Sequence, residues 1–197
     1  MKSTNRRCSH CRKKITTEDA IIGGLRAFCS YSHLQEFMQS SKGKKARELS
    51  VRKELREVRE KYKSKGEYIK EAQAAFNKYI RVRDQGKPCI SCGNMPESYY
   101  GGGVDAGHWR SRGSAPHLRF HTLNCWAQCK RCNRYLSGAS TEYRKELINR
   151  IGKQRVEALE ADQTERRFSI EYLKRVKDIF TRRAKIYNKI RKRFDIV

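Results

Sequence analysis

The sequence is short of acidic side chains, and it has no long apolar segment. Lysine and arginine number 46 in the 197 residues and aspartate and glutamate only 21, so the formal net charge is +25. A protein with such an excess of positive charge commonly binds nucleic acid or an anionic membrane surface. No apolar run approaches the roughly 20 residues that a membrane span needs. We therefore expect nucleic acid as the partner, and no membrane contact.

Apolar residues make up only 37% of the chain, which is low for a protein with one large core. Small modules held together by metal ions, with helices around them, fit such a shortage. Residues 1–12 are polar and basic and lack the apolar centre of a secretory signal, so we expect a cytoplasmic protein. In that reducing compartment the eight cysteines are better explained as metal ligands than as disulfides.

Two pairs of candidate zinc ligands lie near the N-terminus. Cys8 and Cys11 form a Cys-x-x-Cys pair, and Cys29 and His33 follow after a segment that contains two adjacent glycines for a turn. Cys29 and His33 are four positions apart, which places them on one face of a helix. Four such ligands complete a tetrahedron and leave no open position, so we predict a structural zinc site here.

A second set of zinc ligands is made of two further Cys-x-x-Cys pairs. Cys89 and Cys92 form one pair, and Cys129, predicted to open a short helix, forms the other with Cys132. Two such pairs are a strong indication of structural zinc. Cys125 lies four residues before Cys129, and we interpret it as a small buried side chain, with a ligand role as the alternative.

Other polar side chains lie between or beside these cysteines and could hold and use a second metal ion: Asp105, His108, Asn124 and Asn133. Residues 94–103 are predicted to be a loop and residues 104–110 a strand. In that strand Asp105 and Gly107 share one face, and His108 lies on the other.

A basic loop is predicted at residues 111–123, and it suits contact with phosphates. Its Arg119 could hold a phosphate through two parallel hydrogen bonds. His117 and His121 in the same loop are alternative metal ligands or bases.

Helical periodicity dominates the rest of the chain. Residues 34–65 are predicted to form a charged helix with a thin apolar seam at Val51, Leu55, Val58 and Tyr62. The seam indicates either a solvated linker helix or a coiled-coil arm that makes a homodimer. Further helices are predicted at residues 67–85, 141–152, 153–161 and 169–193. The last of these has a face of Lys and Arg, which either contacts the DNA backbone or is simply solvated.

We therefore predict a mostly α-helical protein with small zinc-stapled modules, divided into four regions. These are an N-terminal zinc finger at residues 1–40, a basic helical linker and packing helix at 41–86, a zinc-stapled core at 87–140 and a basic helical region at 141–197.

Several motifs from about Glu71 to Arg193 carry a likeness to a known family: Pro88-Cys-Ile-Ser-Cys-Gly93, Asp105-Ala-Gly-His108, Pro116-His-Leu-Arg-Phe120, Asn124, Gln128-Cys129, Cys132-Asn133, Ser137-Gly138 and Tyr143-Arg-Lys-Glu-Leu-Ile-Asn-Arg-Ile-Gly152. With them the chain resembles the NinG (Rap) family of recombination endonucleases of lambda-like phages. The N-terminal finger is similar as well, with His33 in place of a fourth cysteine. The resemblance implies a phage protein that acts in the cytoplasm of a bacterial host on branched DNA, Holliday junctions and D-loops, beside phage or host recombination proteins.

A more distant likeness concerns residues 89–133. Holliday-junction endonucleases of the endonuclease VII type also carry two cysteine pairs around an Asp, a His and an Asn. This resemblance implies a ββα-metal (HNH, treble-clef-like) endonuclease core, in which Asp105 and Asn133 hold Mg²⁺ or Mn²⁺ and His108 is the general base. Asn124 would hold the loop or orient His108. In that type the Asp directly precedes the His, whereas Ala-Gly intervenes here, and the strand face shared by positions 105 and 107 keeps Asp105 on the required side.

The residue types suit phosphodiester hydrolysis. A neutral His takes a proton from water at physiological pH, and Asp and Asn oxygens favour a hard cation while thiolates favour zinc. We therefore predict a hydrolase, an HNH-type endodeoxyribonuclease with two structural Zn²⁺ and one catalytic Mg²⁺ or Mn²⁺. The alternative is a non-catalytic zinc-containing protein that binds or scaffolds DNA junctions.

Overall fold

The computed structural model describes residues 6–96 and 103–194. Two compact units divide the chain, Met1–Lys63 and Ser64–Val197, and each is described by itself. Most of the loop predicted at 94–103, residues 97–102, lies outside the described residues. Within the described ranges, no helix combines the length and the hydropathy that crossing a bilayer requires.

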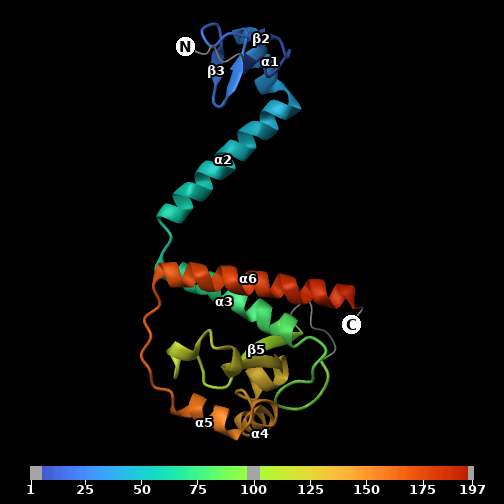
Figure 1. The fold of residues 1–197 in the computed structure, drawn as a ribbon, viewed down its shortest axis with the longest axis vertical. Helices are drawn as coiled ribbons and strands as arrows, with labels where there is room; N and C mark the ends of the chain where they lie inside the picture. The colour runs from blue at the N-terminus through green and yellow to red at the C-terminus, as the bar shows by residue number, and fades with distance from the viewer. Residues whose placement is uncertain (1–5, 97–102, 195–197) are drawn as a thin grey trace. The chain divides into compact units, whose positions relative to one another are not determined.

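The first unit begins with two short antiparallel hairpins, β1 with β2 and β3 with β4, and continues into two helices (Figure 1). Its elements are β1 (Arg6–Arg7), β2 (Lys14–Ile15), β3 (Ile21–Gly23), β4 (Arg26–Phe28), α1 (Tyr31–Gln39) and α2 (Ser41–Lys61). Its buried apolar cluster consists of Cys8, Phe28 and Phe37, with a few partly buried neighbours. Hydrophobic burial alone therefore gives this unit little stability.

The helix predicted at residues 34–65 is interrupted at Ser40, which ends α1 and begins α2. The Ser40 hydroxyl donates to the Phe37 carbonyl at 2.6 Å and accepts from the Gly43 amide at 3.1 Å. A Cβ on Gly43 would lie 1.9 Å from the Phe37 carbonyl oxygen, so only glycine fits this corner. The prediction of one continuous helix is wrong because apolar spacing does not report a side-chain cap.

The apolar seam of α2 faces solvent within its unit. Val51, Leu55, Val58 and Tyr62 are 45%, 64%, 54% and 76% exposed. Both alternatives for this helix, a solvated linker and an arm for self-association, require such an exposed seam.

The second unit places a two-stranded sheet among four α-helices. Its elements are α3 (Lys65–Arg83), β5 (Val104–His108), the 3₁₀ turns η1 (Pro116–Leu118) and η2 (Thr122–Asn124), β6 (Cys125–Cys129), the short π-helical segment η3 (Arg131–Tyr135), α4 (Ser140–Ile151), α5 (Lys153–Ala161) and α6 (Ile170–Arg193). The four helices predicted in this part of the chain are confirmed within two residues at each end.

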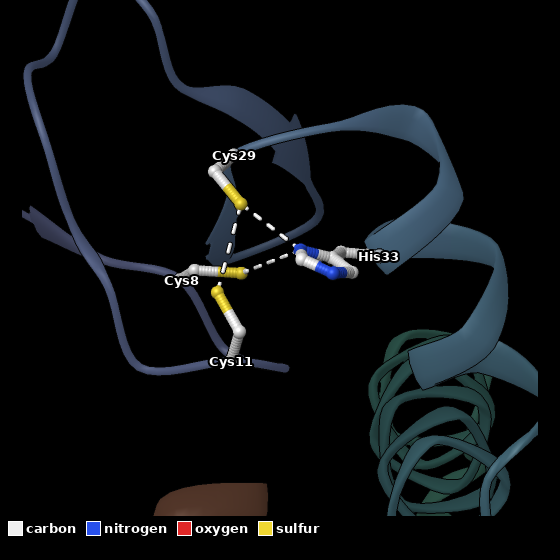
Figure 2. A group of neighbouring side chains, drawn as sticks. All are labelled: Cys8, Cys11, Cys29 and His33. Carbon is white, nitrogen blue, oxygen red and sulfur yellow. Dashed lines mark hydrogen bonds between the residues drawn. The ribbon is translucent and has the colours of Figure 1, made fainter.

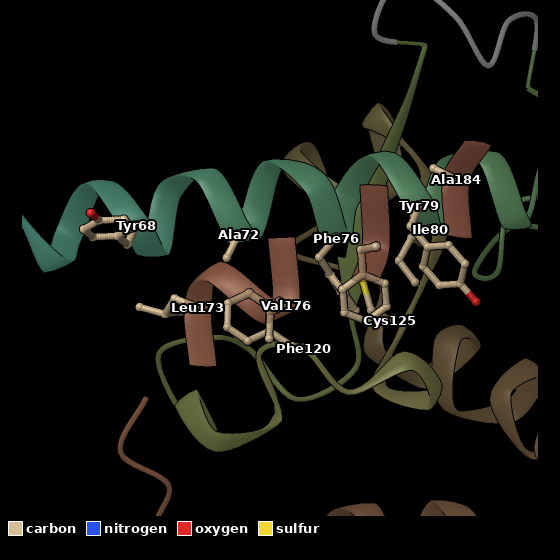
Figure 3. Packing of buried hydrophobic residues seen from close by; sticks show 11 residues of the cluster. Tyr68, Ala72, Phe76, Tyr79, Ile80, Phe120, Cys125, Leu173, Val176 and Ala184 are labelled. Carbon is tan, nitrogen blue, oxygen red and sulfur yellow. The ribbon is translucent and has the colours of Figure 1, made fainter. Parts of the chain in front are cut away.

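Helices α3 and α6 pack along each other and form a hydrophobic cluster (Figure 3). Phe76 of α3 meets Phe180 of α6 edge to face, with 4.9 Å between ring centres. Helix α3 begins at a capping box, in which the side chains of Ser64 and Glu67 accept each other's backbone amides. The apolar residues of α3 are thus buried against α6 and the sheet.

Strands β5 and β6 are antiparallel, and both contact α3. Their register places Asp105 opposite Gln128 and His108 opposite Cys125. Segment η3 follows β6 directly, so the chain runs as strand, loop, strand and helical turn between the two cysteine pairs.

Two boundaries of this segment differ from the predictions. The strand predicted at 104–110 ends at His108, because the amides of the next two residues bond to the backbone and side chain of Asn124. Cys129 does not open a helix but ends β6, and the helical segment starts at Arg131.

A buried ion pair joins the end of α3 to β6. Asp84 is fully buried and receives two hydrogen bonds from the Arg83 guanidinium, at 2.6 and 2.8 Å. Its carboxylate also accepts the amide of Ala127 in β6 at 3.0 Å. The Arg83 guanidinium stacks on Trp126, 4.2 Å from the ring centre. The pair therefore fixes the strand that carries the second cysteine pair.

We expect Asp84→Asn to lower the free energy of unfolding by about 3–5 kcal/mol, because it leaves the Arg83 charge buried and uncompensated. Urea unfolding measures this change. Glu71→Gln is the matched control, since the Glu71–Lys177 pair has side chains 36% and 47% exposed and its loss should cost less than about 1 kcal/mol. Equal losses in the two variants would contradict the role given to Asp84.

Candidate functional site

The first predicted zinc tetrad comes together in the first unit (Figure 2). The ligand atoms of Cys8, Cys11, Cys29 and His33 all lie within 4.8 Å of one another. The sulfurs of Cys11 and Cys29 are 3.6 Å apart, and His33 Nδ1 is 3.0 and 3.9 Å from the sulfurs of Cys29 and Cys8. Ligands about 2.3 Å from one zinc ion stand roughly this far apart. The tetrad could therefore hold a structural zinc.

The crowding of thiols in this tetrad favours a bound cation on electrostatic grounds. Burial, together with the neighbouring thiols of Cys11 and Cys8, raises the pKa of Cys29 to about 11. Three thiolates this close repel one another in the absence of a central positive charge. A divalent cation removes that repulsion, and its binding is linked to the loss of the thiol protons.

The second tetrad comes together in the second unit. The sulfurs of Cys89, Cys92, Cys129 and Cys132 all lie within 4.8 Å of one another, and those of Cys92 and Cys129 are 3.9 Å apart. Backbone amides point at two of the sulfurs: Cys129 N lies 3.3 Å from Cys89 Sγ, and Cys132 N lies 3.5 Å from Cys129 Sγ. Gly93 follows the first pair with φ +71°, the conformation that glycine adopts most easily. This tetrad could also hold a structural zinc.

Asp105 and Asn133 are brought together beside the second tetrad. Asn133 Nδ2 donates to Asp105 Oδ2 at 2.9 Å. Arg134 donates to both carboxylate oxygens, at 2.6 and 2.9 Å. The Arg134 hydrogen bonds lower the pKa of Asp105, so this carboxylate is ionised, as a metal ligand must be.

His108 lies on the opposite face of β5, against α3. Its Nε2 is 3.0 Å from the Arg119 carbonyl, its Nδ1 is 3.6 Å from the Cys125 sulfur, and its ring contacts Phe76. Burial lowers the pKa of His108 and keeps the ring neutral. In the described part of the chain, no hydrogen bond or ion pair joins His108 to Asp105 or Asn133.

Asn124 closes the loop between the two strands. It is fully buried, its Oδ1 accepts the Arg110 amide at 2.9 Å, and its Nδ2 donates to the carbonyls of Arg110 and Leu118 at 3.0 and 3.4 Å. One side chain thus ties both ends of the loop that begins directly after His108.

The guanidinium of Arg119, in the same loop, makes few hydrogen bonds to the described residues. Its one hydrogen bond to a described side chain is a long one, 3.4 Å to Gln73 Oε1. Burial and the positive charge of Arg112 lower its pKa. An anion between the two arginines would relieve their repulsion.

The two alternative histidines of this loop lie elsewhere. His117 is buried and bonds to the Asp162 carbonyl at 2.9 Å. The Nδ1 of His121 is buried without a hydrogen-bond partner among the described residues. Neither histidine joins the Asp105–Asn133 pair.

Two features of the site are absent from the sequence predictions. A Cβ on Gly107 would lie 2.1 Å from Gln128 Oε1, so this position has no room for a side chain. The buried Gln128 is held there by Ser91 at 2.7 Å and by the Gly138 carbonyl at 2.6 Å. The pairing of Arg134 with Asp105 is the second feature. No sequence pattern distinguishes Arg134 from the many other arginines of the chain.

We expect about two zinc ions per chain in the purified protein and about one in Cys29→Ser, because three ligands hold zinc far more weakly than four. The first unit should unfold with its zinc, since its apolar cluster is small. Metal analysis and amide exchange of residues 6–40 measure both effects. Cys125→Ser changes a buried cysteine outside both tetrads and should keep both ions. Loss of zinc from that variant, or none from Cys29→Ser, would overturn the assignment.

Comparison with known proteins gives a family. The model of the family described as Bacteriophage Lambda NinG protein matches residues 1–191. Proteins named ninG from Escherichia phage lambda, Enterobacteria phage H19B and Salmonella phage P22 are 41%, 42% and 40% identical over 123 residues. The matched region is 62% of this chain and 58–59% of those proteins, so the chain spans under two thirds of the relatives' length. No solved structure matches it. Since the family model covers almost the whole chain, the protein belongs to the bacteriophage lambda NinG family.

Proposed function

We propose that this protein is a metal-dependent endonuclease that cuts branched DNA, such as Holliday junctions and D-loops, during phage recombination. Residues 87–140 would form its HNH-type, ββα-metal core. The observation that carries the proposal is the meeting of Asp105 and Asn133, 2.9 Å apart, beside a cysteine tetrad on a strand–loop–strand–helix segment. A protein that used its tetrads only for structure would not need Asp105, His108 and Asn133 near one point. Of these three side chains Asp105 and Asn133 meet, whereas His108 lies on the opposite face of β5.

Asp105 and Asn133 fit a hard divalent cation by their chemistry. The Asn133 amide can turn its oxygen to the same point as the Asp105 carboxylate, since the two amide orientations occupy the same space. Arg134 now holds both Asp105 oxygens, but its side chain is 57% exposed and can move to a phosphate. A bound Mg²⁺ or Mn²⁺ would neutralise charge on the phosphate and stabilise the leaving oxygen.

His108 would be the general base. Its Nε2–H donates to the Arg119 carbonyl, so Nδ1 carries the lone pair that can accept a proton. A water molecule that gives its proton to this nitrogen forms the new P–O bond while the ester P–O bond breaks. Nδ1 now lies 3.6 Å from the buried Cys125 thiol, so substrate binding would have to free this nitrogen while Nε2 keeps its bond to the Arg119 carbonyl.

Asn124 and Arg119 would support this chemistry. Asn124 holds the loop that begins after His108, and Arg119 has the free donors to hold a phosphate. Most Lys and Arg side chains of α6 are exposed and would contact the DNA backbone, whereas Lys177 pairs with Glu71 of α3 and Arg191 donates to the Gln85 carbonyl.

The deciding experiment is cleavage of a labelled four-way junction and of a matched linear duplex with Mg²⁺ or Mn²⁺. We expect the wild type to cut the junction, and His108→Ala and Asp105→Asn each to slow cutting at least about 100-fold while still binding the junction. Asp178→Asn removes an exposed carboxylate on α6 and should cut like the wild type. Binding by all variants with cutting by none would sink the nuclease proposal.

The pH profile should carry the signature of His108. A base must be neutral, and burial lowers the pKa of this ring, so the neutral form persists below the ordinary value of about 6.5. We therefore expect the single-turnover cutting rate to be level from about pH 8 to about pH 6.5 and to fall only at more acid pH. A rate that already falls between pH 8 and pH 7 would contradict a buried neutral histidine as the base.

The second candidate function is a scaffold that binds junctions without cutting them. Two observations favour it: Arg134 occupies the Asp105 carboxylate, and both nitrogens of His108 face protein groups. This candidate predicts junction binding with no cleavage under any divalent cation.

A further inference from the structure

A basic hollow of about 630 Å³ lies within the first unit, between the zinc-ligand module and the start of α2. Four cations line it, and we use the term basic hollow for the space between them: Arg12, Arg26, Lys42 and Lys45. Among the described residues that line it there is no carboxylate. Four positive charges around one space repel one another unless an anion lies between them.

These four side chains have no ion-pair partner in the described part of the chain. Arg26 lies over the ring of Phe37, 5.1 Å from its centre. The neighbouring carboxylate, Glu36, is taken by His10 at 3.0 Å and by the Ser32 hydroxyl at 2.9 Å. The first turn of α2 contains no acidic residue, so its free amides add to the positive potential.

Arg12 occupies a backbone position that would suit glycine better. It follows Cys11 with φ +68°, and its amide donates to the Cys8 carbonyl at 2.9 Å. In the second tetrad the same place, after Cys92, is taken by Gly93, with φ +71° and the equivalent bond to the Cys89 carbonyl at 3.0 Å. The first module therefore carries a strained arginine where its counterpart has an unstrained glycine, and that arginine lines the basic hollow.

We propose that the basic hollow binds the phosphodiester backbone of DNA, as a contact of the first unit in addition to the core at residues 87–140. A single phosphate ion does not need four cations. A DNA strand, in contrast, presents a row of phosphates that recur about every 3.4 Å of axis. The proposal rests on the proposed function only in taking DNA as the polyanion. On this proposal, an arginine is kept at this strained position because its side chain binds phosphate. Glycine would remove the backbone strain but has no side chain to do so.

The test is binding of the full-length, zinc-loaded protein to a fluorescent four-way junction, without divalent cation, over a range of salt concentrations. Arg12→Gly removes the charge and the strain together, and Lys45→Gln removes a charge from α2. Arg47→Gln is the matched control, because it lies two positions from Lys45, on the other side of the same helix, and does not line the basic hollow.

We expect Arg12→Gly and Lys45→Gln each to weaken binding about eightfold at 0.1 M salt and to reduce the salt slope by about 1, the effect of one lost phosphate contact. Arg47→Gln should change affinity less than about twofold. Arg12→Gly should keep both zinc ions and resist chelators at least as well as the wild type, since glycine adopts this φ freely. Lower affinity together with an undiminished zinc site separates a binding role from a structural one.

Equal losses in all three variants would mean that only the general positive field acts, and unchanged binding in Arg12→Gly and Lys45→Gln would mean that DNA does not enter the basic hollow. Either result overturns the proposal. If Arg12→Gly loses zinc, the comparison of DNA affinity between Lys45→Gln and Arg47→Gln decides whether DNA enters the basic hollow. Because no divalent cation is present, these outcomes are independent of cleavage, and a protein that never cuts DNA could still confirm the basic hollow.

Discussion

The second unit depends on the convergence of four cysteines from two distant segments. Cys89 and Cys92 precede β5, whereas Cys129 and Cys132 lie at the end of β6 and in η3. Since Val104 pairs with Cys129, the end of β5 that carries Asp105 lies next to the tetrad, and Asn133 follows Cys132 directly. The meeting of Asp105 with Asn133 is therefore a consequence of closing the tetrad. A structural metal would position the side chains proposed for the catalytic one.

The side chains proposed to bind the metal ion and to act as the base lie on opposite faces of β5. Asp105 projects toward Asn133 and Arg134, while His108 projects toward α3 and the Arg119 carbonyl. In a chain of net charge +25, an ionised carboxylate without a metal takes the nearest guanidinium as its partner. A DNA phosphate offers that guanidinium a different partner. If the protein cuts DNA as proposed, binding of substrate would release the Asp105 carboxylate through the charge of the phosphate alone.

Local patterns predicted the helices of the second unit and strand β5, but not the hairpins of the first unit or strand β6. Ligand spacing predicted both tetrads because a zinc site imposes spacing directly on the sequence, and 3.6-residue periodicity predicted α3 and α6 because each buries one face. The break at Ser40, the ion pair of Arg83 with Asp84 and the exclusion of a side chain at Gly107 were not predictable in the same way. Each depends on an atom contributed by another segment or by a cap, and apolar periodicity contains no record of such contacts.

Part of the positive charge of the chain is used in internal hydrogen bonds and ion pairs. Arg83 and Arg110 donate to backbone carbonyls, Arg144 pairs with Glu160, and Arg150 pairs with Glu146 and donates to the Pro88 carbonyl. Neutralising these arginines would remove internal hydrogen bonds as well as charge, so their effect on DNA binding would be mixed with an effect on stability. The cations of the basic hollow lack ion-pair partners among the described residues. Net charge therefore overstates the number of side chains that are free to bind phosphate. The internally bonded arginines and the cations of the basic hollow differ in their partners, not in residue type.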